Sequence, residues 1–264
     1  MIAPPARYPL PLGLPLSDTP LNLLLEDGPL LAVNKPPGLL TVGAIPGVPT
    51  LERQVKDYLR QKYQKPGNVY LGIPHRLDRP VSGVVVFARN SKCADRLAEQ
   101  FRDRTVRKTY WALVSGADLP DSGEWTDWLL KAPDEAQVRV VPAETPGARE
   151  ARLRFHCLAR LPASDPATSP RSLVEIELDT GRMHQIRVQF ASRGFPVCGD
   201  LQYGSHEPFG FLPVTDLRDA PIALHARQLE LKHPIRYDTL VLQAPLPEAW
   251  SAVTATLPAE VLAR

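Results

Sequence analysis

Residues 74–90 read PHRLDRPVSGVVVFARN, and this stretch decides how the rest of the chain is interpreted. Its second half, residues 84–88, is a short apolar run of β-branched and aromatic residues, which predicts a strand buried on both faces. Its first half is a loop that carries Asp78 between Arg76 and Arg79. Neighbouring cations keep a carboxylate ionised, and a rigid strand holds it in one place. Asp78 is therefore either a nucleophile or base, or a turn aspartate neutralised by its neighbours.

The composition is that of an ordinary globular protein, with 44% hydrophobic and 23% charged residues. The three cysteines are far apart and show no Cys-x-x-Cys spacing, so we expect neither a disulfide framework nor a cysteine zinc site. The six histidines also lack metal-ligand spacing, and His225 and His233 are interpreted as hydrogen-bonded structural groups. Prolines interrupt the apolar N-terminus, and no apolar run approaches the ~20 residues of a membrane span. These features predict a cytoplasmic protein with no metal and no membrane contact.

Charge is distributed unevenly along the chain. Residues 52–108 contain 14 Lys and Arg against 6 Asp and Glu, a net charge of +8, whereas the whole chain has a net charge of +2. A basic block around the loop of Asp78 predicts a polyanionic partner, most simply a nucleic acid. The alternative is that these cations only cover solvated helix surfaces.

Periodicity predicts many strands and few helices. Helices are expected from an N-cap at Thr50, around residues 94–101, at 183–193 and at 247–257. Lys35 precedes a Pro-Pro-Gly turn and is interpreted as a surface lysine or a phosphate contact. Strands and helices do not alternate regularly, so we expect an α+β fold with a mixed or antiparallel sheet. Besides residues 84–88, strands are expected at 23–25, 30–34, 109–115, 125–130, 137–141, 151–161, 173–178, 228–231 and 240–243.

A second cluster of polar residues lies in residues 180–200, TGRMHQIRVQFASRGFPVCGD. Met183, Ile186 and Phe190 have the spacing of one helix face. One interpretation is an amphipathic surface helix. The other is an anion site, because the dipole at a helix N-terminus favours phosphate or carboxylate. Four hydrogen-bond donors gather at this predicted N-terminus: Arg182, His184, Gln185 and Arg187.

Four stretches occur in this order: HRLDRPVSGVVVFARN, KTYWALVSG, TGRMHQIRVQFASRGFPVCGDLQYG and LHARQLELKHP. Together with LLAVNKPPGLLTV upstream, they resemble the RluA-type RNA pseudouridine synthases from about residue 22 to residue 245. One residue departs from the family pattern, since Val81 stands where the family usually has Thr. The resemblance implies a long mixed sheet in two halves, with flanking helices and a central catalytic cleft. It also implies an extended arm at residues 1–20 and a single catalytic domain at residues 21–264, without an extra N-terminal RNA-binding domain.

The resemblance further implies the reaction, in which a uridine of tRNA, large-subunit rRNA or both becomes pseudouridine without a cofactor. Asp78 would be the catalytic aspartate, and Arg187 would pair with it and hold it ionised. Tyr110 would lie against the uracil and help to remove the proton from carbon 5. The target base must leave its stack to reach such a pocket, and Arg76 would fill the vacated space. Whether Asp78 attacks the sugar or removes a sugar proton stays open.

We expect a monomer that grips the RNA backbone through the basic block and through residues near the catalytic groups. One alternative is a hydrolase that uses Asp78 with a histidine, but the sequence contains neither metal spacing nor a serine elbow. Another alternative is a non-catalytic RNA-binding module of the same fold, whose RNA affinity would survive the loss of Asp78. The expected RNA contacts are His75, Arg76, Arg79, Lys108, Arg182, His184 and Gln185.

Overall fold

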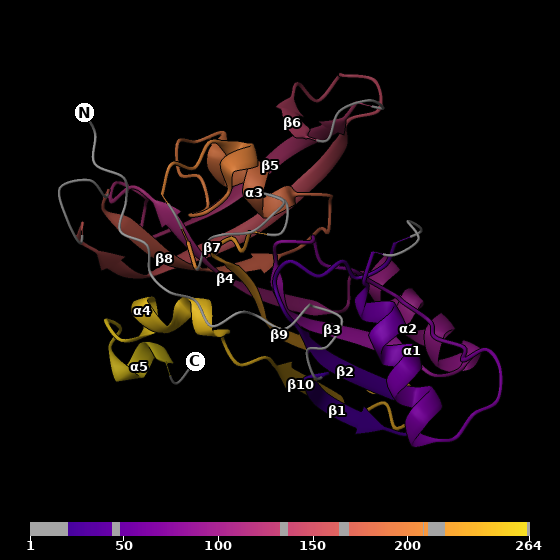
Figure 1. Cartoon of the computed structure of the whole chain (residues 1–264). Coiled ribbons are helices and arrows are strands. Elements are labelled where there is room, and N and C mark those ends of the chain that lie inside the picture. Colours follow the sequence, from indigo (N-terminus) through magenta and orange to yellow (C-terminus); the bar gives the residue numbers. More distant parts are fainter. Residues whose placement is uncertain are drawn as a thin grey trace.

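The computed structural model describes residues 21–43, 48–132, 137–163, 169–207, 209–210 and 220–262 of the 264-residue chain (Figure 1). The extended arm expected at residues 1–20 lies outside these residues. The helices are α1 (Leu51–Lys62), α2 (Ser91–Arg102), α3 (Gln185–Ala191), α4 (Ser251–Thr254) and α5 (Ala259–Leu262). The strands are β1 (Leu23–Asp27), β2 (Leu30–Lys35), β3 (Ser82–Ala88), β4 (Arg107–Ser115), β5 (Ser122–Lys131), β6 (Val138–Val141), β7 (Arg149–Leu161), β8 (Arg171–Leu178), β9 (Leu224–Lys232) and β10 (Thr239–Gln243).

These strands form one mixed sheet in the order β1-β2-β3-β9-β4-β8-β7-β5-β6. The first part of β9 pairs with β3, and the rest of the same edge of β9 pairs with β10. Neighbouring strands are antiparallel except β3 and β9, which are parallel over two residue pairs. The helices α1 and α2 lie beside the β1–β3 end of the sheet, and α3 lies beside β5 and β6 at the other end (Figure 1). The α+β class with a mixed sheet in two halves is therefore confirmed.

The part of the sheet formed by β1–β3 joins the rest of the sheet through β9, and the two backbones approach each other closely at Gly83. This residue has a φ of 122°, and a Cβ added to it would lie 2.3 Å from the carbonyl oxygen of Ala226 on β9. Only glycine permits both the backbone conformation and the close approach. Beside it, Ser82 Oγ lies 2.8 Å from Nδ1 of the buried His225, whose Nε2 lies 3.2 Å from the carbonyl oxygen of Ala244. His225 is thus a structural group, as predicted.

The central strand is buried along its whole length, as its composition predicts. All seven residues of β3 are buried. Val85 and Phe87 pack in the same cluster as the apolar face of α1, whereas Val84 and Val86 pack in the cluster that contains α2. Thr50 caps α1 through its side-chain oxygen, as predicted, whereas α2 begins at Ser91, three residues before the expected apolar face, where the side-chain oxygen of Asn90 caps it.

The helix expected at residues 183–193 differs from its prediction in length and in burial. It begins only at Gln185, because His184 adopts the left-handed conformation with a φ of 52°. All residues from Gln185 to Phe190 are buried. The interpretation as an amphipathic surface helix is therefore wrong. The other helix predicted near the C-terminus divides into a 3-10 turn at Glu248–Trp250 and the short α4.

Candidate active site

The loop that carries Asp78 is clamped on both sides of this residue. Thr41 Oγ1 donates to the carbonyl oxygen of Leu77 at 2.9 Å and accepts from its N–H at 3.1 Å. On the other side, the N–H of Val81 donates to the carbonyl oxygen of Asp78 at 3.1 Å. The side chain of Val81 is buried in the main hydrophobic core. The turn therefore closes through the backbone, and the residue that departs from the family pattern contributes packing there.

Lys35 ties this loop to the turn that follows β2. Its side chain is fully buried, and Nζ donates to the carbonyl oxygens of Leu39 at 2.6 Å, Pro36 at 3.0 Å and Arg79 at 3.1 Å. Burial lowers the pKa of Lys35 to about 7, and the charge of Asp78 acts in the opposite direction. Both sequence interpretations of Lys35 are wrong, because it is neither on the surface nor free to contact a phosphate. It holds the catalytic loop in place.

Arg187 joins two carboxylates from different segments. Its Nη1 donates to Oδ2 of Asp78 at 3.3 Å, which brings together the two residues expected to pair. Its stronger partner is Asp200, which accepts from Nε at 2.6 Å and from Nη2 at 2.8 Å. Burial acts to lower the pKa of Arg187, but the hydrogen bonds and charge of Asp200 and the charge of Asp78 raise it above its ordinary value. Arg187 is thus a permanent cation that is aimed by Asp200.

The carboxylate of Asp78 keeps one side open. Its side chain is 29% exposed, whereas those of Arg187 and Asp200 are 4% and 1% exposed. Both Arg187 and His184 approach Oδ2, and no described residue donates a hydrogen bond to Oδ1. Oδ1 is therefore the oxygen that can meet a substrate.

His184 lies in this site with its ring between Asp78 and Tyr203. Its Nε2 is 3.7 Å from Oδ2 of Asp78, and its Nδ1 is 2.8 Å from Oη of Tyr203. Oη of Tyr203 also accepts from the N–H of Val138 at 2.9 Å. Burial, and then the neighbouring charge of Arg187, lower the pKa of His184 against the pull of Asp78. A neutral ring that accepts the tyrosine proton at Nδ1 presents its N–H at Nε2 toward Asp78.

Tyr110 enters the site from β4. It pairs with Ala226 of β9, which pairs in turn with Gly83 just after the loop of Asp78. Burial, and then the negative charge of Asp78, raise the pKa of Tyr110 above its ordinary value. The phenol is consequently neutral while Asp78 is ionised. Sequence reasoning placed Asp78, Tyr110 and Arg187 in one site, and the structure brings all three together.

Two of the expected RNA contacts are engaged inside the protein. The side chain of Gln185 is buried, and it bonds Thr180 Oγ1, the N–H of Arg182 and the carbonyl oxygen of Arg152, so it organises the loop before α3. His75 stacks on Phe101 at a centroid distance of 4.6 Å. Its Nε2 accepts from the N–H of Val86 at 3.0 Å.

The other expected RNA contacts lie closer to solvent. Arg76 is exposed, and no described residue forms a hydrogen bond or ion pair with it. Arg79 donates to the carbonyl oxygen of Gly38 at 3.3 Å. Arg182 donates to the carbonyl oxygen of Glu150 at 2.9 Å. Arg76 is therefore the side chain on the catalytic loop that can move into RNA.

The basic block of residues 52–108 divides into paired and unpaired cations. On α1, Lys56 lies 2.6 Å from Glu52 and Arg60 lies 2.5 Å from Asp57, and both pairs are on the helix surface. Solvated ion pairs of this kind account for α1, as the alternative interpretation of the block proposed. Lys108 on β4 has no hydrogen bond or ion pair with a described residue and is only partly exposed. Of the cations without a described partner, Arg76 lies on the loop of Asp78 and Lys108 lies on the same strand as Tyr110.

Sequence reasoning did not assign Asp200, Gln202 and Tyr203, although all three support the site. Gln202 Oε1 accepts from Nη2 of Arg187 at 2.8 Å, and the Tyr203 ring centroid lies 4.9 Å from the Arg187 guanidinium carbon. The available signal was the run Gly-Asp-Leu-Gln-Tyr-Gly at residues 199–204, which begins eight residues after the end of α3. Nothing local in that run indicates that it turns back onto Arg187.

The described part of the chain contains no group of three His, Cys, Asp or Glu side chains arranged to hold a metal ion. All three cysteines are free. Among the described residues, no helix has the length and hydropathy that crossing a membrane requires.

Comparison with known proteins identifies the family. The family model described as RNA pseudouridylate synthase matches residues 29–192. The chain is 32% identical over 217 residues to tRNA pseudouridine synthase C of Salmonella typhi, which covers 77% of this chain and 78% of that protein. It is 35% identical over 182 residues to ribosomal large subunit pseudouridine synthase D of Nitrosomonas europaea, which covers 69% of this chain but only 50% of that protein.

A solved structure agrees with these sequence matches. Human RNA Pseudouridylate Synthase Domain Containing 4 superposes with a TM-score of 0.67 at 25% identity, over 88% of this chain and 93% of that chain. The fold that the motifs implied is thereby confirmed. The chain belongs to the RNA pseudouridylate synthase family, and its motifs are those of the RluA type.

Proposed function

We propose that residues 21–264 form a single catalytic domain that isomerises a uridine in folded RNA to pseudouridine, as a cytoplasmic monomer. The observation that carries the proposal is the open oxygen of Asp78, held beside Arg187 and Tyr110. The isomerisation exchanges one bond of the base for another and is redox-neutral, so no step needs a cofactor.

The reaction must detach uracil through N1 and rejoin it through carbon 5. In one route, Asp78 attacks C1′ of the ribose, and the electrons of the C1′–N1 bond leave with the uracil. The base turns, carbon 5 attacks C1′ and displaces the carboxylate, and the proton on carbon 5 is then removed while N1 gains a proton, so the product is an isomer of the substrate. In the other route, Asp78 removes the C2′ proton as uracil leaves, and the proton returns after carbon 5 has bonded to C1′. The exposed oxygen of Asp78 suits either route.

The charges of the site explain an order of events. The carboxylate of Asp78 raises the pKa of Tyr110, so the phenol stays protonated and stacks on the uracil while Asp78 is free. In the covalent route, bonding to C1′ removes that negative charge and lowers the pKa of Tyr110. The charge returns when carbon 5 displaces the carboxylate, so Tyr110 is again a neutral phenol when the proton on carbon 5 leaves. Arg187 stays protonated throughout, because the ion pair with the carboxylate of Asp200 stabilises its guanidinium cation.

The substrate is proposed to be tRNA, large-subunit rRNA or both. Support comes from relatives of both kinds, since one matched protein is named for tRNA and another for the large ribosomal subunit. The unpaired cations near the catalytic loop supply the positive charge that an RNA backbone requires. Arg76, Arg79, Lys108, Arg182 and His184 remain the proposed RNA contacts, whereas His75 and Gln185 support these residues through bonds inside the protein.

The test uses RNA that carries tritium at carbon 5 of uracil, prepared from cells that lack this gene. The purified protein is expected to release tritium from the tRNA pool, the rRNA pool or both, while Asp78→Asn releases none and keeps its RNA affinity within a few-fold. Asp121→Asn, which removes an equivalent charge from the surface, serves as the control. Full tritium release by Asp78→Asn would refute the role of Asp78. RNA binding without release by the wild type would identify a non-catalytic RNA-binding module.

A further inference from the structure

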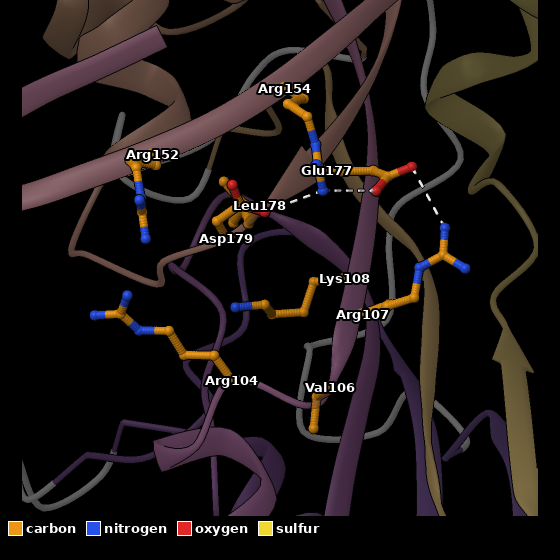
Figure 2. Close-up of a pocket in the computed structure, with 9 residues that line it drawn as sticks. All are labelled: Arg104, Val106, Arg107, Lys108, Arg152, Arg154, Glu177, Leu178 and Asp179. Atoms are coloured by element: carbon orange, nitrogen blue, oxygen red, sulfur yellow. Dashed lines mark hydrogen bonds and ion pairs between the residues drawn. The ribbon is translucent and has the colours of Figure 1, made fainter. Parts of the chain in front are cut away.

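A cavity of about 350 Å³ lies where the start of β4 meets β7, β8 and the turn after α2. Figure 2 shows its lining side chains. Five of the nine lining residues are cations and two are acids, so the cavity carries an excess of positive charge. The lining consists of Arg104, Val106, Arg107, Lys108, Arg152, Arg154, Glu177, Leu178 and Asp179.

One side of the cavity is neutralised by ion pairs. Arg154 Nη2 lies 3.1 Å from Asp179 and 3.5 Å from Glu177. Arg107 reaches Glu177 at 3.6 Å and Glu230 at 3.4 Å. The dashed lines of Figure 2 join Arg107 and Arg154 to these acids within the cavity. These two arginines have partners already and form the cavity's outer wall.

The opposite side holds cations whose charge is not matched. Arg104, Lys108 and Arg152 extend toward a common region in Figure 2. Neither Arg104 nor Lys108 forms a hydrogen bond or ion pair with a described residue. Arg152 pairs with Glu150 through Nε at 3.2 Å, and none of its terminal nitrogens donates to a described residue. Three cations that face one space repel one another unless an anion lies between them.

The pKa directions agree with this crowding. Burial, and then the charge of Arg104, lower the pKa of Lys108 against the opposing effect of Asp179. Burial lowers the pKa of Arg182, and the charges of Arg104 and Arg149 lower it further. Arg104 therefore lies close to two other cations.

The backbone at Arg104 is also unusual. This residue follows the C-cap of α2 and has a φ of 59°, in the left-handed region. Helices that end in this way usually carry glycine at that position. A side chain with a Cβ is strained in this conformation. The chain therefore places a guanidinium at a position where glycine would be more stable.

Lys108 connects this cationic side with the uracil site. It shares one face of β4 with Tyr110, two residues further along, so their side chains are about 7 Å apart. A group bound at Lys108 is thus a close neighbour of a base stacked on Tyr110. The anion that fits is one attached to the same RNA strand.

We propose that Arg104, Lys108 and Arg152 form a phosphate subsite that binds the RNA backbone beside the target uridine. The inference rests on the proposed function and specifies which cations hold the strand. The subsite positions the nucleotide that enters the site, and the paired Arg107 and Arg154 do not take part.

The test compares Arg104→Gly and Lys108→Met with the wild type and with Arg160→Gln. Arg160 is paired with Asp121 at the surface. It lies on β7 eight residues, or about 26 Å, beyond Arg152, so its substitution controls for the loss of one charge outside the cavity. Binding of unfractionated tRNA and of large-subunit rRNA is measured at several salt concentrations. Initial rates of tritium release give kcat and KM for the pool on which the wild type acts.

Arg104→Gly and Lys108→Met are each expected to weaken binding about tenfold, as loss of one charge-assisted contact does. The slope of log Kd against log salt should fall by about 0.7 in each variant. KM should rise and kcat should stay within a few-fold, and Arg104→Gly should unfold at the same or a higher temperature than the wild type. Loss of affinity without loss of stability would exclude misfolding as the cause.

Unchanged affinity and salt slope in both variants, or an effect in only one of them, would overturn the shared subsite. An equal loss in Arg160→Gln would overturn it too, because the effect would then be general electrostatics. These results are distinct from failure of the proposed function, which is recognised when the wild type itself releases no tritium from either pool.

Discussion

The carboxylate of Asp200 holds the guanidinium of Arg187 through two hydrogen bonds of 2.6 and 2.8 Å, whereas Arg187 reaches Asp78 through a single one of 3.3 Å. Asp200 is 1% exposed and cannot meet RNA. The cation beside the catalytic aspartate is therefore aimed by a second, buried aspartate that takes no part in substrate contact.

Asp200→Asn is expected to lower kcat about 100-fold, because a misplaced Arg187 no longer orients Asp78. KM should change only a few-fold, since the residue is buried away from the RNA. Rates of tritium release measured beside RNA binding separate the two effects. Asp121→Asn on the surface should behave like the wild type. A normal kcat with lost RNA affinity would contradict the positioning role.

Asp78→Asn is expected to lower the pKa of Tyr110, because one of the two causes that raise it is the charge of Asp78. Burial should still hold the value above that of a free tyrosine. An NMR titration of protein with ¹³C at tyrosine Cζ would follow the change, with Asp103→Asn as a surface control. If Tyr110 titrates at the same pH in both proteins, its proposed coupling to the state of Asp78 is wrong.

Arg76→Ala is expected to slow the extrusion of the target base while leaving the free energy of unfolding within about 0.5 kcal/mol. The reason is that Arg76 is exposed and has no protein partner among the described residues. A fluorescent base analogue next to the mapped uridine should brighten less on binding the variant than on binding the wild type. Arg160→Ala provides the matched control. An unaltered signal would remove Arg76 from the flipping step.

Lys35→Met is expected to destabilise the fold by about 3 kcal/mol, because three carbonyl oxygens, that of Leu39 fully buried, lose their shared donor. The catalytic loop should loosen as well, so kcat should fall in the variant under conditions where it remains folded. Urea unfolding measures the first effect and tritium release the second. Lys92→Met on the exposed side of α2 should change neither quantity.

His75→Gln is expected to reduce the acid sensitivity of the fold. Burial lowers the pKa of His75 from 6.5 to about 3, so below pH 6.5 the unfolded chain binds a proton that the folded protein does not. Stability is therefore fully present above pH 6.5 and is lost as the pH falls toward 3, by up to about 1.4 kcal/mol per pH unit.

The glutamine can accept from Val86 N–H but does not titrate in this range. The variant should be somewhat less stable at pH 7, because it loses the stacking on Phe101, yet it should lose less stability on acidification. Urea unfolding at pH 7 and pH 4.5 measures the difference. His225, with a pKa lowered to about 4, contributes equally in both proteins. Identical pH dependence would show that His75 is not the titrating group.

The sequence by itself determined the elements and the reactive loop. Strand β3 followed from a run of β-branched residues, α1 followed from its cap at Thr50 and helical spacing, and α2 followed from helical spacing alone, because caps and periodicity act within one or two turns. The loop of Asp78 could likewise be recognised as a candidate site from the sequence, since its charged residues and the strand that follows them are adjacent in the chain. These features need no information about distant segments.

Only the tertiary structure decided which side chains share the site. Arg187 meets Asp78 across 109 positions of sequence, and Lys35 meets the carbonyl of Arg79 across 44. Asp200 and Tyr203 contact Arg187 because the chain turns back after α3, and no local sequence pattern predicts the direction of that turn. Burial then assigns the roles, because a buried lysine or histidine must find its partners inside the protein. Local propensity shapes the elements, and the packing of distant segments determines which charges meet.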